Sequence, residues 1–418
     1  MGLPYQTEDY DEVVGGGATN LDDLLDTNIN SLTLANGDAL VYNSTTSKWE
    51  NNIISSSDPL TDLYILEPNP TNSTAISTQI KNNFQSAWWL EYTNTFTAGP
   101  AHGQGSGAFN GGVLAPNGKV IFVPCNSANI GIYEPETNTY TSGPAHGVGG
   151  SDKFVGGVLA PNGQVILVPA NSPNIGIYDP LANTYSSGPA HGRGGNAFNG
   201  GVLAPNGNVI LVPFNSSVIG IYEPFSGTYI NGPTHGEGST AFKGAVLIPD
   251  GKIILIPDGA DYVGIYDPVA NTYTRGPAHG KGNGAFIGGV MATNGKVILV
   301  PTISPNVGIY DPVGNTYTDG PAHGRGAAAF FGGVLASDGK VIFIPFNSSL
   351  IGIYDPIANT YINGPAHGRG GGAFFGGTLA LNGRIVFIPF ISTNIDTYGR
   401  TYPLVYQNDA LAPYFNKF

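Results

Sequence analysis

Short apolar runs separated by turn signals recur along most of the chain, from residue 94 to residue 400. One period, residues 285–324, reads AFIGGVMATNGKVILVPTISPNVGIYDPVGNTYTDGPAHG. It holds four runs rich in β-branched and aromatic residues, bounded by an Asn-Gly pair, a Pro-containing loop and an Asp-Pro pair. No run is long enough, or has the spacing, for an amphipathic helix. Each period therefore predicts four consecutive antiparallel strands.

The period is marked by the pentapeptide GPAHG, which becomes GPTHG in one copy. All seven histidines of the chain are the fourth residue of this motif, and they follow one another at 44 residues, with one interval of 45. A repeat of this length is typical of arrays in which each unit is one supersecondary element. Four meandering strands per unit predict the blade of a β-propeller.

The first two strands of every period, AFxGGVLA and KVILVP in consensus, are joined by an Asn-Gly or Asp-Gly pair. Such pairs tolerate positive φ at both positions, so we expect two-residue type I′ hairpin turns. The seven pairs begin at Asn117, Asn162, Asn206, Asp250, Asn294, Asp338 and Asn382. The third and fourth strands are joined through an Asp-Pro or Glu-Pro turn with Asn or Gly at its exit.

The ends of the array predict a closed ring. The last period has a third strand at residues 394–398 but no fourth strand, whereas residues 94–100 (NTFTAGP) match a fourth strand that precedes the first full period. Pairing the two would leave no open edge between the first and last blades. The expected fold is all-β, a seven-bladed β-propeller over residues 94–400 that is closed by its N-terminal strand, with a small β-rich segment before it.

The repeat resembles kelch and galactose-oxidase-like propellers in the strand pair IYDPVANTY at residues 265–273 and its sister copies. The resemblance covers residues 94–400 and implies the propeller fold, but no particular function. The chain departs from the kelch pattern in two ways. Val-Pro or Ile-Pro replaces the Gly-Gly after the second strand, and Tyr replaces Trp in the fourth strand.

The histidines have two interpretations. They could form a ring of ligands for a metal or for sugars, or each imidazole could bond a backbone carbonyl of the adjoining blade. Equivalent positions around a ring are far apart, whereas a metal needs its ligands at about 2 Å. The residue two positions later also varies without an evident rule. We therefore predict a structural inter-blade loop, and neither a metal nor a cofactor, for His102, His146, His191, His235, His279, His323 and His367.

Other candidate residues also favour a structural interpretation. The Gly-Gly pairs of the first strands precede no helix that could bind phosphate, and they suit the crowded centre of a ring. Cys125 stands where the other blades have unrelated residues, and Asp258 and Asp261 break the pattern of the fourth blade only. Because no blade carries a distinct acid, base or nucleophile set, we predict that the protein is not an enzyme. Candidate recognition loops carry Asn126, Asn171, Asn215 and Asn347.

Residues 1–93 lie outside the repeat. We divide them into an acidic, flexible segment (1–20), a small module (21–54) and a Ser/Pro/Asn-rich connector (55–93), and residues 401–418 form a C-terminal tail. The stretch GDALVYNSTTSKWEN at residues 37–51 resembles a module of phage and large-DNA-virus fibre proteins. That resemblance implies attachment to a particle or to sister chains. The alternative is a hairpin that packs on the propeller.

Composition limits the partners. The net charge is −13, and no Lys/Arg run exists, which argues against nucleic acid and anionic membranes as partners. The N-terminus has no signal-peptide pattern, and no apolar run is long enough to span a bilayer. A single cysteine excludes an intrachain disulfide.

These observations favour a virion structural protein, located on an extracellular particle. Residues 1–54 would bind virion proteins or sister chains, and the propeller would recognise a host-surface glycan or protein. The alternatives are a soluble multivalent lectin and, with least support, a galactose-oxidase-like enzyme.

Overall fold

The computed structural model describes residues 38–43, 48–53 and 94–400. The chain divides into two units, Met1–Tyr92 and Thr93–Phe418, and each is described by itself. In the first unit, β1 (Asp38–Asn43) pairs antiparallel with β2 (Lys48–Ile53), with Tyr42 opposite Trp49. The expected hairpin is therefore present. No described residue belongs to a helix, so none lies in a helix that could cross a membrane.

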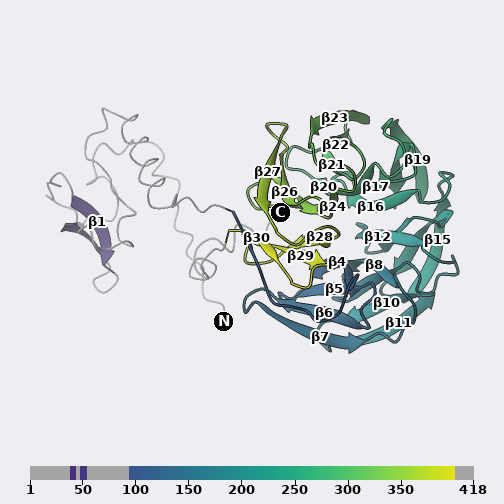
Figure 1. The fold of residues 1–418 in the computed structure, drawn as a ribbon, viewed down its shortest axis with the longest axis horizontal. Helices are drawn as coiled ribbons and strands as arrows, with labels where there is room; N and C mark the ends of the chain where they lie inside the picture. The colour runs from purple at the N-terminus through teal and green to yellow at the C-terminus, as the bar shows by residue number, and fades with distance from the viewer. Residues whose placement is uncertain (1–37, 44–47, 54–93, 401–418) are drawn as a thin grey trace, which may run out of the picture. The chain divides into compact units, whose positions relative to one another are not determined.

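The second unit is a ring of seven four-stranded antiparallel sheets (Figure 1), which confirms the predicted seven-bladed β-propeller. The innermost strands are β4 (Phe109–Leu114), β8 (Phe154–Leu159), β12 (Phe198–Leu203), β16 (Phe242–Leu247), β20 (Phe286–Met291), β24 (Phe330–Leu335) and β28 (Phe374–Leu379). The second strands are β5 (Val120–Pro124), β9 (Val165–Pro169), β13 (Val209–Pro213), β17 (Ile253–Pro257), β21 (Val297–Pro301), β25 (Val341–Pro345) and β29 (Ile385–Pro389).

The third strands are β6 (Asn129–Glu134), β10 (Asn174–Asp179), β14 (Val218–Glu223), β18 (Tyr262–Asp267), β22 (Asn306–Asp311), β26 (Leu350–Asp355) and β30 (Thr397–Gly399). The outermost strands are β7 (Thr139–Ala145), β11 (Thr184–Ala190), β15 (Thr228–Thr234), β19 (Thr272–Ala278), β23 (Thr316–Ala322), β27 (Thr360–Ala366) and β3 (Thr95–Thr97). We number the blades 1 to 7 from the β4 sheet to the β28 sheet.

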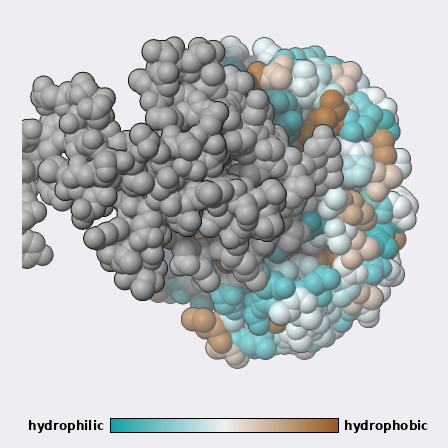
Figure 2. Space-filling model, turned by 90° about the vertical axis from the view of Figure 1, so that its left-hand side faces the viewer, coloured by the Kyte–Doolittle hydropathy of each residue, from teal (hydrophilic) through white to brown (hydrophobic). Residues whose placement is uncertain are grey.

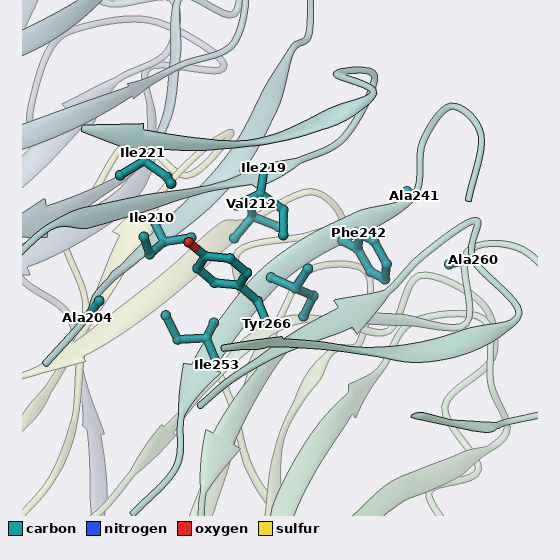
Figure 3. Packing of buried hydrophobic residues seen from close by; sticks show 11 residues of the cluster. Ala204, Ile210, Val212, Ile219, Ile221, Ala241, Phe242, Ile253, Ala260 and Tyr266 are labelled. Atoms are coloured by element: carbon teal, nitrogen blue, oxygen red, sulfur yellow. The ribbon is translucent and has the colours of Figure 1, made fainter. Parts of the chain in front are cut away.

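The hydrophobic core lies between blades. Each of seven buried clusters combines residues from two adjacent blades, one cluster at each junction of the ring. Figure 3 shows the junction of blades 3 and 4, where Tyr266 points toward Ile210 and Val212 of the neighbouring blade. The second strands are buried along their whole length because both of their faces pack on other blades, so they read as continuous apolar runs.

Strand direction gives the ring two different faces. One carries the turns between first and second and between third and fourth strands, and we call it the turn face. The other carries the loops between second and third strands and the links that lead from one blade to the next. Because every GPAHG motif lies in such a link, we call this second face the histidine face.

The turns between first and second strands differ from the expected type I′. Only the glycine has positive φ, between 78° and 87°, and none of the Asn or Asp residues before it does. In blade 1 the amide of Gly118 donates to the carbonyl of Ala115 (3.0 Å), and that of Ala115 to the carbonyl of Lys119 (2.8 Å). This is a type I turn followed by a left-handed glycine. Four blades carry Pro before the Asn or Asp, and its fixed negative φ suits a type I turn.

The ring closes as predicted: β3 supplies the fourth strand of blade 7 and pairs with β30, with Phe96 opposite Tyr398. The third strand expected at residues 394–398 begins only at Thr397. Asp396 stands where the other blades have glycine, and its carboxylate accepts two 2.7 Å hydrogen bonds from the Arg369 guanidinium. The ladder is therefore irregular before Thr397.

A buried arginine holds the closing strand. Arg384 stands where the other blades have Lys, Gln or Asn, and its guanidinium donates to the Thr97 hydroxyl (2.7 Å) and the Thr95 carbonyl (3.1 Å) of β3. It also donates to the carbonyl of Gly399 in β30 (2.8 Å). Bonds to a charged donor are stronger than neutral ones. Arg384 thus joins residues near both ends of the repeat array.

Candidate recognition face

The seven histidines occupy equivalent places on the histidine face, and each imidazole uses both nitrogens. Nε2 lies 2.7–2.9 Å from a backbone carbonyl of the loop between the second and third strands of the blade just completed. Nδ1 accepts the backbone N–H two residues farther along, at 3.1–3.3 Å. This pattern requires the neutral tautomer with the proton on Nε2. No lone pair remains for a ligand.

Each imidazole also contacts the next blade. Its ring meets the edge or face of the first-strand phenylalanine there, with centroids 5.5–5.7 Å apart, as in His191 and Phe198. The side chains are buried, with 4–6% of their surface exposed. Burial lowers the pKa of His146, His191 and His323, and nearby positive charges act in the same direction. In the part of the chain that the structure describes, no three His, Cys, Asp or Glu residues are placed to hold a metal.

Replacing one histidine tests this arrangement. We expect His191→Ala to lower the free energy of unfolding by about 1–3 kcal/mol, because the carbonyl of Ser172 loses its buried partner. Denaturant unfolding of the purified protein measures the change. Leu181→Ala, at a side chain that is 87% exposed on the turn face, should leave stability unchanged and serves as the control. An unchanged free energy of unfolding for His191→Ala would contradict a structural role.

The four asparagines in the predicted recognition loops form hydrogen bonds across the junctions between blades. Each is exposed, but its Oδ1 accepts a backbone N–H of the next blade at 2.9–3.2 Å; the four are Asn126, Asn171, Asn215 and Asn347. The other three blades have Gly259, Ile303 and Ile391 at this position. The loops therefore do not present seven equivalent sets of free polar groups.

Glu237 and Lys281, which follow their histidines by two positions, form ion pairs although they carry opposite charges. Glu237 accepts from the Arg275 guanidinium at 2.6 Å, and the Lys281 ammonium lies 2.6 Å from Asp319. In each pair, the partner lies on the fourth strand of the following blade. The sign of the charge is reversed between these two junctions, and complementary partners compensate for it.

Two other candidates are also accounted for by local contacts. The Cys125 thiol donates to Asp152 Oδ1 at 3.1 Å, and burial, with help from this hydrogen bond, raises the pKa of the thiol far above its ordinary value. Asp258 lies 3.3 Å from the Lys243 ammonium, and burial raises its carboxyl pKa against the opposing effect of that charge. A neutral, buried thiol is a poor nucleophile.

The blades differ from one another at the centre of the histidine face. Two positions per blade meet there: the residue after the first-strand phenylalanine and the residue after the proline of the second strand. We call these residues the axial cluster. In blades 1 to 7 they are Asn110 and Cys125, Val155 and Ala170, Asn199 and Phe214, Lys243 and Asp258, Ile287 and Thr302, Phe331 and Phe346, and Phe375 and Phe390.

Aromatic residues fill one sector of the axial cluster. Phe331 stacks on Phe346 with centroids 3.8 Å apart, and it meets Phe375 of the next blade edge-on at 4.8 Å. Phe390 lies 5.6 Å from Phe375. On the opposite side of the ring, the Lys243 ammonium lies 5.0 Å from the centre of the Phe214 ring, in addition to its contact with Asp258. No signal within a single repeat reveals this cluster, because each blade contributes only two of its side chains.

Comparisons with known proteins agree on the fold. No family model and no curated protein matches the chain. Among solved structures, a streptogramin B lyase superposes with a TM-score of 0.65 at 13% identity, over 74% of this chain and 98% of the lyase. A fungal alcohol oxidase of the AA5 family in complex with copper gives 0.57 at 12%, over 76% and 78%. The extracellular domain of a one-component system from B. thetaiotaomicron gives 0.58 at 12%, over 74% and 40%. At these identities the likeness extends to the propeller fold alone.

Proposed function

We propose that the protein is a non-enzymatic recognition protein of a virus particle. Its N-terminal module at residues 21–54 binds virion proteins or sister chains, and its propeller presents the histidine face to a host-surface glycan or protein. The observation that carries this proposal is where the chain joins the ring. The strands β3 and β30 are antiparallel neighbours, and the chain enters β3 and leaves β30 on the turn face.

This topology leaves the histidine face without a covalent connection to the flanking segments. On the part of the propeller visible in Figure 2, apolar residues are interspersed with polar ones, as is usual for a surface without a large permanent interface. The resemblance of residues 37–51 to viral fibre modules supports attachment to a virus particle.

The contacts of the candidate catalytic side chains support recognition over catalysis. The seven histidines, Cys125 and Asp258 have partners within the fold, and the neighbouring enzymes share only the propeller with this chain. A soluble lectin is the second candidate, since the histidine face carries the partly exposed, neutral amide of Asn199.

Light scattering on the full chain tests the mounting role. We expect the full chain to form an oligomer, and a chain lacking residues 1–54 to be a monomer with an unchanged propeller melting temperature. A chain lacking only residues 1–20 is the control and should remain an oligomer. If all three are monomers and the full chain does not bind purified virion proteins, the particle role is wrong and the soluble lectin becomes the better candidate.

A further inference from the structure

We propose that the axial cluster is a single saccharide-binding site, one in each propeller, that takes a neutral pyranose from the histidine face. The proposal rests on the proposed recognition function and names its ligand class. It differs from a lectin with several equivalent sites, because the residues that would bind the sugar occur together only once.

Because the cluster lies on the axis of the ring, each propeller has one such site. Its residues lie at the histidine-face ends of the first and second strands, and first strands are the closest elements to the axis. One residue farther along the first strands, seven glycines with positive φ follow one another around the ring. A Cβ on Gly156 would lie 3.0 Å from the Cα of Gly200, so these backbones are in close contact. Access to the cluster is therefore from the histidine face.

The aromatic sector suits the apolar face of a sugar ring. Four phenylalanines that contact one another are all partly exposed, so they offer apolar ring surface to a ligand: Phe331, Phe346, Phe375 and Phe390. A pyranose presents C–H groups on one side, and these pack on aromatic rings with a gain of buried apolar surface.

The remaining groups favour a neutral, hydroxyl-rich ligand. Asn199, which is partly exposed, supplies an amide with both donors and an acceptor. The charges of Lys243 and Asp258 compensate each other at 3.3 Å, while a quarter of the Lys243 side chain stays exposed. The cluster therefore has no net charge that would attract an ion. A purely apolar ligand would bury these polar groups without partners, which costs free energy. Hydroxyl groups can bond with them.

The test uses the full chain and four neutral disaccharides: lactose, cellobiose, maltose and N,N′-diacetylchitobiose. Saturation-transfer NMR at millimolar sugar identifies binding, and titration calorimetry gives the stoichiometry. We expect at least one of the four to bind with one site per chain. Phe375→Ala should weaken binding about fivefold to tenfold through the loss of an aromatic contact. Asn199→Ala, at a partly exposed position of the same cluster, should weaken binding with little change in melting temperature.

Two control variants separate the possibilities. Phe225→Ala removes a phenylalanine that is 78% exposed on the turn face and should leave binding unchanged. Asn171→Ala alters a loop of the histidine face outside the axial cluster and should also have no effect. Several sites per chain, or weakening by Asn171→Ala but not by the axial variants, would overturn the axial site and leave surface recognition intact. Binding of none of the four sugars would also overturn it, while the light-scattering experiment decides the mounting role independently.

Discussion

Gly156→Ala will destabilise the propeller by about 3 kcal/mol or more. Gly156 has φ of 83°, and a Cβ there would lie 3.0 Å from the Cα of Gly200 in the next blade. Left-handed backbone costs a non-glycine residue about 1–2 kcal/mol. The contact adds to this because it meets backbone, which cannot rotate away as a side chain can, and overpacking typically costs about 1–3 kcal/mol.

Gly163→Ala is a matched control in the same blade. Gly163 also has φ of 83°, but a Cβ there would meet no atom within 4 Å. Gly163→Ala should lower the free energy of unfolding only by the cost of the left-handed backbone, about 1–2 kcal/mol. Denaturant unfolding of both variants therefore isolates the contribution of close approach between blades. Equal destabilisation by the two substitutions would show that the ring of glycines is required for backbone conformation alone.

Acidification is expected to weaken several blade junctions at once. At about pH 7.5 and above, an imidazole is almost entirely neutral in both the folded and the unfolded chain, so histidine adds almost no pH dependence there. Because the pKa of His146, His191 and His323 is lowered in the fold, protons bind to the unfolded chain first as the pH falls. The free energy of unfolding should then fall by up to about 1.4 kcal/mol per pH unit for each of them. The loss ends below the folded pKa, where both states are protonated.

The geometry explains why protonation is unfavourable. Nδ1 of His191 accepts the N–H of Arg193, and a proton on Nδ1 would face that donor. Burial raises the pKa of Asp258 and Asp396, which would protonate in the fold first and oppose the loss at lower pH. Urea unfolding at about pH 7.5 and about pH 5.5 measures the slope. A triple variant with Gln in place of His146, His191 and His323 has no group at these positions that titrates in this pH range. An unaltered slope in that variant would assign the acid sensitivity to other groups.

Local sequence signals identified each strand with good precision, since the alternation, the Asn-Gly pairs and the prolines act within a few residues. The turn type was wrong because the connection is longer than two residues. Pro116, Asn117 and Gly118 lie between Ala115 and Lys119, whose backbones are hydrogen-bonded, and only Gly118 adopts positive φ. The third strand of blade 7 was predicted too long because Asp396 replaces a glycine, and its carboxylate pairs with Arg369.

The candidate site was harder to predict, because its contacts join residues from different blades. Glu237 and Arg275 lie 38 residues apart, so no local sequence signal reveals their pairing at 2.6 Å. Phe331 and Phe375 come from adjacent blades and Lys243 from the opposite side of the ring. Their common place at the axis follows only from the closure of seven blades.

By itself, the sequence determined the four-stranded repeat, the number of blades and the strand that closes the ring. These features depend on period, turn residues and the match between the two ends of the array. Only the tertiary structure decided which polar groups are hydrogen-bonded at the blade junctions and which lie together at the axis. The physical reason is that a propeller packs its core between units. Equivalent residues have equivalent surroundings at the junctions, whereas the axis brings together one or two side chains from each blade and so depends on how the blades differ.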